Sequence, residues 1–223
     1  MKPSIPSQAR AIARRDLVRE RRRGEVLWIT IPFGAIALLL IPLAVGTDTL
    51  LLERIGSGLY WVIVMLFGVL VSVRQAAAET TAQRDTLALL GLDPAAGFAG
   101  RAGSAAVLLL VFEIITGVVA VVLYDLPLTG IAWLLAILPL VAAGLGMLGA
   151  IASGIVAWGR GGTALVPFLV APLSVPLLLA ATSAFEGLRL GESILSWIVL
   201  MVVVVLVLAI VGTLTARPLQ EIR

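Results

Sequence analysis

Glu113 is the residue whose type and position first suggest chemistry in this sequence. It lies about ten residues into an uninterrupted apolar stretch at positions 104–124, and no other ionisable residue is placed so deep within such a stretch. A charged carboxylate near the centre of a bilayer costs at least ~2.5 kcal/mol, even on the gentler insertion scales. We therefore expect Glu113 to be protonated or hydrogen-bonded to a neighbouring helix, with a structural or conformational role or, alternatively, a part in proton transport.

The residue types needed for most other site chemistry are absent. The sequence contains no cysteine and no histidine, which excludes disulfides, thiolate metal sites, Ser/His triads and histidine-ligated cofactors within this chain. A proton relay would also need a second intramembrane acid, base or histidine, and an intramembrane enzyme would need a paired constellation such as Ser/Lys or two aspartates within the spans. The sequence places only Glu113 there. We therefore predict a non-catalytic chain that binds no metal and no cofactor of its own.

A glycine-rich turn between two apolar stretches forms a candidate inner loop. Its residues are Trp158, Gly159, Arg160, Gly161 and Gly162. The glycines allow the chain to reverse direction, but the Lys-Ser/Thr of a phosphate-binding loop does not follow them, and the pattern G-x-x-x-x-G-K-[ST] occurs nowhere in the chain. If ATP drives this protein, a separate chain must bind it.

The composition of the whole chain shows which elements must position these residues. Hydrophobic residues make up 61% of the 223, and charged residues only 13%, against about 25% in a soluble domain. We predict an all-α polytopic membrane protein in which residues 1–223 form one transmembrane domain. Six apolar stretches are each long enough to cross a hydrocarbon core about 30 Å thick as a helix: residues 26–46, 55–73, 104–124, 131–157, 164–184 and 193–215.

The distribution of charge predicts the orientation of these spans. The chain has 16 Lys and Arg, and if the N-terminus is in the cytoplasm only Arg54 and Arg189 fall outside, as the positive-inside rule requires. Both termini are therefore predicted to face the cytoplasm, and the basic pI of about 10.2 reflects topology rather than nucleic-acid binding. Aromatic residues near the span ends are predicted to anchor the protein in the headgroup layer: Trp28, Tyr60, Trp61, Tyr124, Trp133, Trp158 and Trp197.

One predicted cytoplasmic segment, residues 74–103, is longer than a connector requires. Its first part, 75–90, favours a helix that begins polar and finishes in leucines, and Gly91 and Asp93-Pro94 are predicted to end that helix. Such an apolar patch lies at the lipid interface, docks to a cytoplasmic protein, or does both. The residues that we assign to coupling with that partner are Glu79, Arg84, Asp85, Leu87, Leu90 and Asp93.

Two spans carry patterns that affect how helices pack or bend. The fifth contains Pro167, Pro172 and Pro176, two of them well inside the helix, where proline removes a backbone hydrogen bond and favours a kink. This kink is either static or part of a moving element. The fourth span has small residues at four-residue spacing, which lets a neighbouring backbone approach closely: Ala142, Gly146, Ala150 and Gly154.

Four segments share a pattern with one family of permeases. They are Arg15-Asp16-Leu17 with Glu20 and Arg22; Asp85, Leu87, Leu90 and Leu92-Asp93 followed by Gly100-Arg101-Ala102; Val111-Phe112-Glu113; and Arg160-Gly161-Gly162 continuing through Pro167, Pro172 and Pro176 to Ala180-Ala181-Thr182. In this order, and with six predicted spans, the sequence resembles the heme exporter protein B (CcmB) permeases of bacterial cytochrome c maturation over essentially its whole length. Residues 88–99 lack the Leu-Ala-Pro-Val-Asp-Arg pattern of that family and keep only its aspartate.

The resemblance implies an ABC-2-type permease subunit that pairs with a separate ABC ATP-binding subunit and works with other cytochrome c maturation membrane proteins in heme delivery. It implies that residues 1–25 form a basic cytoplasmic helix before the first span and that residues 74–103 form the coupling segment. ATP binding in the partner would then move residues 75–90, with Glu113 and the proline-containing span reorganising. Permeases of this family either carry heme themselves or drive its release from a partner membrane protein. We favour the second for this chain, because its only candidate ligands are Met65, Met147, Met201 and two tyrosines, each better explained as packing or anchoring. The alternatives are the permease of another ABC-2-type exporter and a structural membrane subunit without transport.

Overall fold

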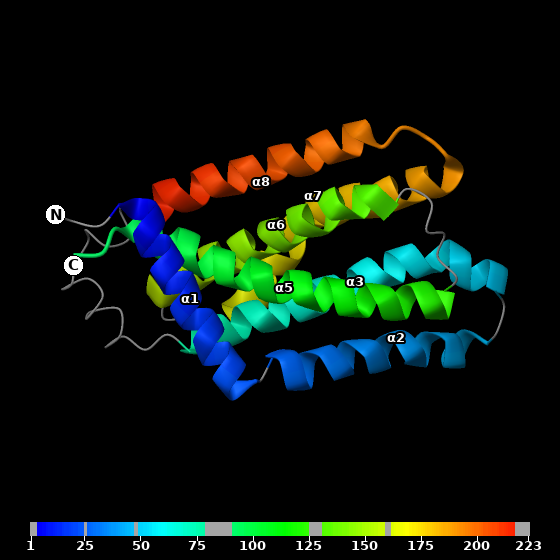
Figure 1. Ribbon diagram of the computed structural model, residues 1–223, viewed down its shortest axis with the longest axis horizontal. Helices are drawn as coiled ribbons and strands as arrows, with labels where there is room; N and C mark the ends of the chain where they lie inside the picture. Colours follow the sequence, from blue (N-terminus) through cyan, green and yellow to red (C-terminus); the bar gives the residue numbers. More distant parts are fainter. Residues whose placement is uncertain are drawn as a thin grey trace.

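The computed structural model is a bundle of long helices, and it describes residues 4–24, 26–46, 49–78, 91–124, 131–158 and 162–216 (Figure 1). These residues contain no strand. Six helical segments are long and apolar enough to cross a membrane, so the predicted six-span all-α fold is confirmed. In chain order the helices are α1 (Ile5–Arg23), the π-helix η1 (Val26–Thr30), α2 (Ile31–Val45), α3 (Thr49–Ala78), α5 (Pro94–Tyr124), α6 (Ile131–Trp158), α7 (Leu165–Leu190) and α8 (Leu195–Ala216).

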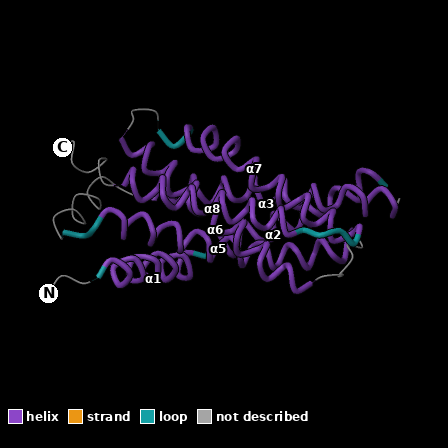
Figure 2. Tube along the Cα trace, turned by 90° about the horizontal axis from the view of Figure 1, so that it is seen from above, coloured by secondary structure: helices purple, strands orange, loops and turns teal. Residues whose placement is uncertain are grey.

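The spans run along the long axis of the molecule with α6 at the centre, where it packs against α3, α5, α7 and α8 (Figures 1 and 2). The outermost spans are α2 and α8, which bury only 17% and 11% of their apolar windows inside the protein. Along α5 the buried positions recur every three or four residues, as in Leu109, Phe112, Thr116 and Ala120, which is the spacing of a single helix face. The other face of α5 is therefore left for lipid.

Close approach of α5 and α6, the most extensively packed pair of helices, depends on small residues of α6. A Cβ atom at Gly146 would lie 2.7 Å from the carbonyl oxygen of Ala102. Ala142 and Ala150, four residues to either side, are buried as well. The predicted packing stripe is confirmed at these three positions but is wrong at Gly154, where a Cβ atom would meet nothing within 4 Å.

The helix predicted before the first span is α1, which lies across the end of the bundle where α8 finishes (Figure 1). It ends at Gly24, whose φ of 67° is a left-handed conformation that favours glycine and whose N–H donates to the carbonyl oxygen of Glu20. Its main contact is with the first turns of α5. The two helices meet closely at Gly100, where a Cβ atom would lie 2.7 Å from the Cβ of Ile12.

The third span is longer than the sequence predicted, because α5 begins at residue 94 rather than 104. Gly91 and Asp93-Pro94 were predicted to end the helix over 75–90, most of which lies outside the described residues, and Pro94 begins the next helix. Proline suits the first turn because its fixed φ is helical and its missing N–H would have had no partner there. The carboxylate of Asp93 also accepts a hydrogen bond from the N–H of Ala95 at 2.8 Å, as helix caps do. Residues 94–103 of the predicted cytoplasmic segment are therefore continuous with the third span.

Three of the predicted headgroup anchors lie inside the protein instead. Tyr60, Trp61 and Tyr124 are only 2%, 1% and 1% exposed, so the anchoring prediction is wrong for them. Trp61 packs edge-on against Tyr60 and Phe185, with ring centroids 4.9 and 5.5 Å away. Trp28 is 80% exposed, which agrees with an anchoring position.

Candidate functional site

Glu113 lies on the face of α5 that is turned into the bundle. The residue is 0% exposed, and neither of its carboxyl oxygens has a hydrogen-bond partner among the described residues. At 1.5 Å per residue, Glu113 is ~29 Å along the helix from Pro94 and ~17 Å from Tyr124, well inside a hydrocarbon core about 30 Å thick. The side chain is buried in the protein, and among the described residues it makes no hydrogen bond to a neighbouring helix. Its depth in the bilayer and its protonated form stay predictions.

Two hydroxyl groups near Glu113 are bonded to the backbone rather than to its carboxyl. The Oη of Tyr60, on α3, donates to the carbonyl oxygen of Glu113 at 2.8 Å. The Oγ1 of Thr116 donates to the carbonyl oxygen of Phe112 at 2.7 Å. The first bond joins α3 to α5, but neither bond satisfies the side chain. A buried polar group without a partner carries a penalty of ~1–3 kcal/mol.

A cavity of about 350 Å³ lies beside Glu113, in the half of the bundle nearer to Tyr124. It is lined mainly by α5 and α6 and also touches α3 and α7. Tyr60 and Glu113 supply its polar atoms. The rest of the described lining is apolar and includes Gly117, Val121, Leu134, Leu138 and Phe185.

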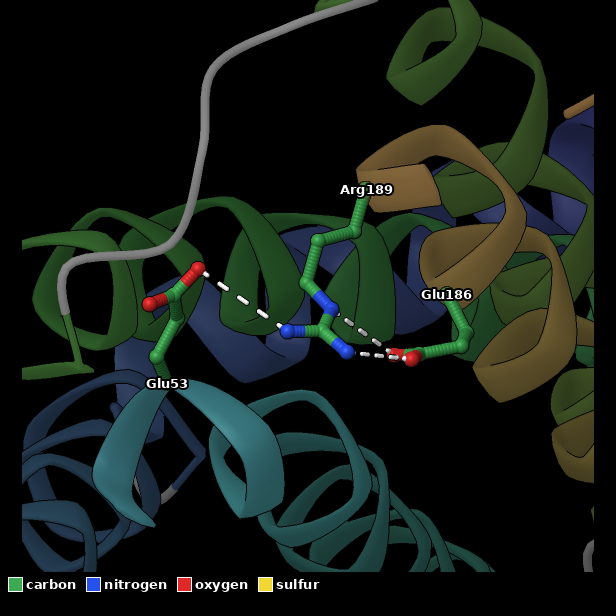
Figure 3. A network of polar contacts seen from close by, with 3 residues as sticks. All are labelled: Glu53, Glu186 and Arg189. Atoms are coloured by element: carbon green, nitrogen blue, oxygen red, sulfur yellow. Dashed lines mark hydrogen bonds and ion pairs between the residues drawn. The ribbon is translucent and has the colours of Figure 1, made fainter. Parts of the chain in front are cut away.

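At this same end of the bundle, the side chain of Arg189 on α7 lies between two carboxylates (Figure 3). Its Nη2 is 2.6 Å from Oε1 of Glu186, and its Nη1 is 4.0 Å from Oε1 of Glu53 on α3. The network therefore joins the end of α7 to the start of α3. Arg189 is one of the two basic residues that the predicted orientation leaves outside, and acidic side chains balance its charge there.

Comparison with known proteins identifies the family of this chain. A family model described as CcmB protein matches residues 7–219, which include all six spans. Heme exporter protein B from Paracoccus denitrificans (strain Pd 1222) is 31% identical over 182 residues, which cover 78% of this chain and 81% of that protein. The chain belongs to the CcmB family. The resemblance drawn from its motifs is confirmed, and with its six spans it is a multi-pass protein of the bacterial inner membrane.

In this member of the CcmB family, Asp93 is the one predicted coupling residue within the described part of the chain. Its carboxylate caps the start of α5, and its backbone N–H donates to the Oε1 of Gln8 on α1 at 3.0 Å. Asp93 thus links α1 to α5, about 20 residues along the chain from Glu113, so these two predicted sites are separate. The other five coupling residues lie outside the described residues: Glu79, Arg84, Asp85, Leu87 and Leu90.

The predicted kink residues lie on α7, which is helical through all three prolines. Pro172 and Pro176 are inside the helix with exposed side chains, whereas Pro167 is half-buried in the first turn. On the buried face, the Oγ of Ser174 donates to the carbonyl oxygen of Ala171 at 2.8 Å. No proline lines the described cavity, so the structure does not bring the prolines together with Glu113. A moving role for them stays a prediction.

The candidate inner loop connects α6 to α7. Trp158 is the last residue of α6, and Gly162 precedes α7 with a φ of 63°, a left-handed conformation that favours glycine. Gly159, Arg160 and Gly161 lie outside the described residues.

Sequence reasoning did not identify Tyr60, Gln8 or Gly100 as positions that join helices. A signal existed for Gly100, since Gly97, Gly100 and Gly103 recur at every third residue and small residues favour close helix contact. No comparable signal existed for Tyr60 and Gln8, because their partners lie 53 and 85 residues away in the sequence.

Proposed function

We propose that this chain is the membrane-spanning permease subunit of an ATP-driven transporter that serves heme export in cytochrome c maturation. The observation that carries the proposal is the match of the CcmB family model to residues 7–219. The 31% identity to a protein named heme exporter protein B supports it. The chain itself has no phosphate-binding loop motif, so an ABC ATP-binding subunit supplies the nucleotide site.

The proposed coupling route runs through the end of the bundle that α1 crosses. Asp93 follows the predicted coupling residues directly, and its hydrogen bond to Gln8 ties that point of the chain to α1. Gly100 packs against Ile12 two turns further on. A movement of the coupling segment is passed to α1 and α5 together because these contacts join them. Helix α5 then carries the movement into the membrane, towards Glu113.

In the proposed complex, other cytochrome c maturation membrane proteins hold the heme iron, and this subunit drives release of heme from them. Heme iron is usually held by His, Cys, Met or Tyr. The chain has no His or Cys. The hydroxyls of Tyr60 and Tyr124 both donate to backbone carbonyls inside the bundle, at 2.8 and 2.9 Å, and Met201 is 0% exposed. These side chains are therefore occupied in packing rather than free to ligate.

The test is affinity purification of the tagged chain from native membranes in mild detergent, with mass spectrometry and an ATPase assay on the eluate. We expect an ABC ATP-binding subunit to co-purify and to hydrolyse ATP. The double variant Leu87→Asp, Leu90→Asp is expected to lose that subunit, because two carboxylates would enter an apolar contact. A strain lacking the gene is expected to lose covalently bound heme in its c-type cytochromes.

A matched control places the same two charges, at the same spacing, at the other end of the bundle. Ser193→Asp with Ser196→Asp changes two exposed residues beside the start of α8 and is expected to keep the ATPase. If the purified chain brings no ATPase, the structural-subunit alternative replaces the proposal. Normal c-type cytochromes in the deletion strain, with the ATPase still bound, would instead point to another exporter.

A further inference from the structure

The proposed coupling route reaches Glu113 but does not use the hydrogen-bonding capacity of its carboxyl. Both of its oxygens are buried and lack a partner among the described residues. The hydroxyls of Tyr60 and Thr116, close to Glu113, already donate to backbone carbonyls. The cavity of about 350 Å³ that Glu113 lines is the space from which a partner can reach it.

The surface around this cavity faces the hydrocarbon of the bilayer. Ile114, Val118 and Val122 lie four residues apart on α5 and line the cavity. They are 49%, 62% and 77% exposed, so exposure rises towards the Tyr124 end of the helix. On a membrane span, exposed apolar side chains contact acyl chains. A ligand can therefore enter sideways from the bilayer without crossing water.

We propose that this cavity binds a neutral, membrane-dissolved lipid alcohol. Its hydroxyl group forms hydrogen bonds with the carboxyl of Glu113, and its hydrocarbon tail leaves past Val118 and Val122 into the bilayer.

The class of ligand follows from the groups that line the cavity. A neutral carboxylic acid has one O–H donor and an acceptor oxygen, and an alcohol has the same two capacities, so one hydroxyl can satisfy both. No Lys or Arg is present in the described lining, and hence nothing there balances a phosphate or a carboxylate. A charged head would also lose its hydration at this depth, which is far more costly than for a hydroxyl.

The size of the cavity agrees with a head and the first part of a tail. Its volume of about 350 Å³ is near the lower limit of sites that enclose small molecules, about 300–1,000 Å³. A whole lipid does not fit inside, but the exposed side of α5 lets the tail lie along the bundle among other acyl chains. Tyr60 remains available at the cavity wall as a second acceptor, because its hydroxyl donates elsewhere.

The experiment uses two photoreactive probes in native membranes that contain the complete complex. One is hexadecanol with a diazirine in its chain, and the other is hexadecane with the same diazirine but no hydroxyl. After irradiation, the tagged chain is purified and its adducts are mapped by mass spectrometry. We expect the alcohol to label peptides lining the cavity about tenfold more than the hydrocarbon, the ratio equivalent to ~1.4 kcal/mol. On α8, which faces lipid, the two probes should label equally.

Four variants separate the hydroxyl contact from general access. Glu113→Leu is expected to bring the labelling ratio to unity, whereas Glu113→Gln, which keeps a donor and an acceptor, is expected to retain most of the preference. Val118→Trp should block entry of both probes into the cavity, because Val118 lies on its exposed side. Val107→Trp is the matched control, because Val107 is also exposed on α5, at 46%, but does not line the cavity. Gel filtration checks that each variant is folded.

Three results would overturn the inference. Equal labelling of the cavity by both probes in the unaltered chain would make it an ordinary acyl-chain contact. A tenfold preference that survives Glu113→Leu would remove the carboxyl from the site. Absence of label from both probes, with α8 labelled normally, would mean that a partner helix covers the cavity in the complex. Each of these readouts is independent of ATPase activity and of heme export.

Discussion

Replacing Gly146 with alanine tests the close contact between α5 and α6. A Cβ atom at this position would lie 2.7 Å from the carbonyl oxygen of Ala102 and 2.9 Å from the backbone nitrogen of Ala106. Both atoms belong to the backbone of α5, so no side chain can rotate away, and the helices must separate. Gly154→Ala is the matched control, since the same methyl group on the same helix would meet nothing within 4 Å.

The magnitude follows from two opposing effects. Alanine stabilises the interior of a helix by ~0.5–1 kcal/mol relative to glycine, and both variants gain this amount. Inserting a methyl group into a well-packed contact costs ~1–3 kcal/mol, and only Gly146→Ala incurs this cost. We therefore expect Gly154→Ala to be neutral or slightly stabilising, and Gly146→Ala to be ~1–3 kcal/mol less stable than that control.

The assay is equilibrium unfolding of the purified chain in mixed detergent and SDS micelles, followed by tryptophan fluorescence. The free energy of unfolding of each variant is compared with that of the unaltered chain. If Gly146→Ala is as stable as Gly154→Ala, the two helices are not in close contact at this position. A loss of stability in Gly154→Ala would instead show that the nominally open position is covered.

Three further changes test other contacts of the bundle. Gly100→Val should separate α1 from α5, because a Cβ atom there clashes with α1. Trypsin should then cut α1 several-fold faster. Gly103→Val, with open space around it, should not alter the rate of cleavage. Tyr124→Phe removes an interhelical hydrogen bond of 2.9 Å to Leu38 and should lower the free energy of unfolding by ~0.6 kcal/mol; no change would mean that this bond is absent in the membrane. Arg189→Gln breaks the ion pairs around Arg189, including the one to Glu53 on α3, and should reduce the dependence of thermal stability on salt; an unchanged dependence would mean that these pairs do not contribute to stability.

The number and type of the spans could be predicted because they are properties of local sequence. A segment of about 20 apolar residues must form a helix in the bilayer, since its backbone has no other hydrogen-bond partners there. The small-residue stripe around Gly146 was visible for a similar reason, because a four-residue spacing on one helix gives one face. The same spacing does not produce a close contact at Gly154. Two helices touch at a given residue only if the neighbouring helix extends that far, and the spacing does not show where the neighbour ends.

The start of α5 shows how a local signal can be ambiguous. Pro94 is equally compatible with the end of one helix and the beginning of the next. The hydrogen bond from Asp93 to Gln8, a residue on α1, is a contact with a distant part of the chain, and the sequence does not reveal it.

The sequence alone predicts the six spans, the family and one carboxyl deep in the membrane. These predictions depend on hydrophobicity, residue spacing and motif order, which are properties of the linear sequence. Only the tertiary structure shows that Tyr60, Trp61 and Tyr124 face inward and that a cavity edged by exposed apolar side chains of α5 adjoins Glu113. These properties depend on which side of each helix meets another helix. In a bilayer both sides of a span are apolar, so hydrophobicity does not distinguish lipid from protein, and packing and hydrogen bonds between distant segments decide the arrangement.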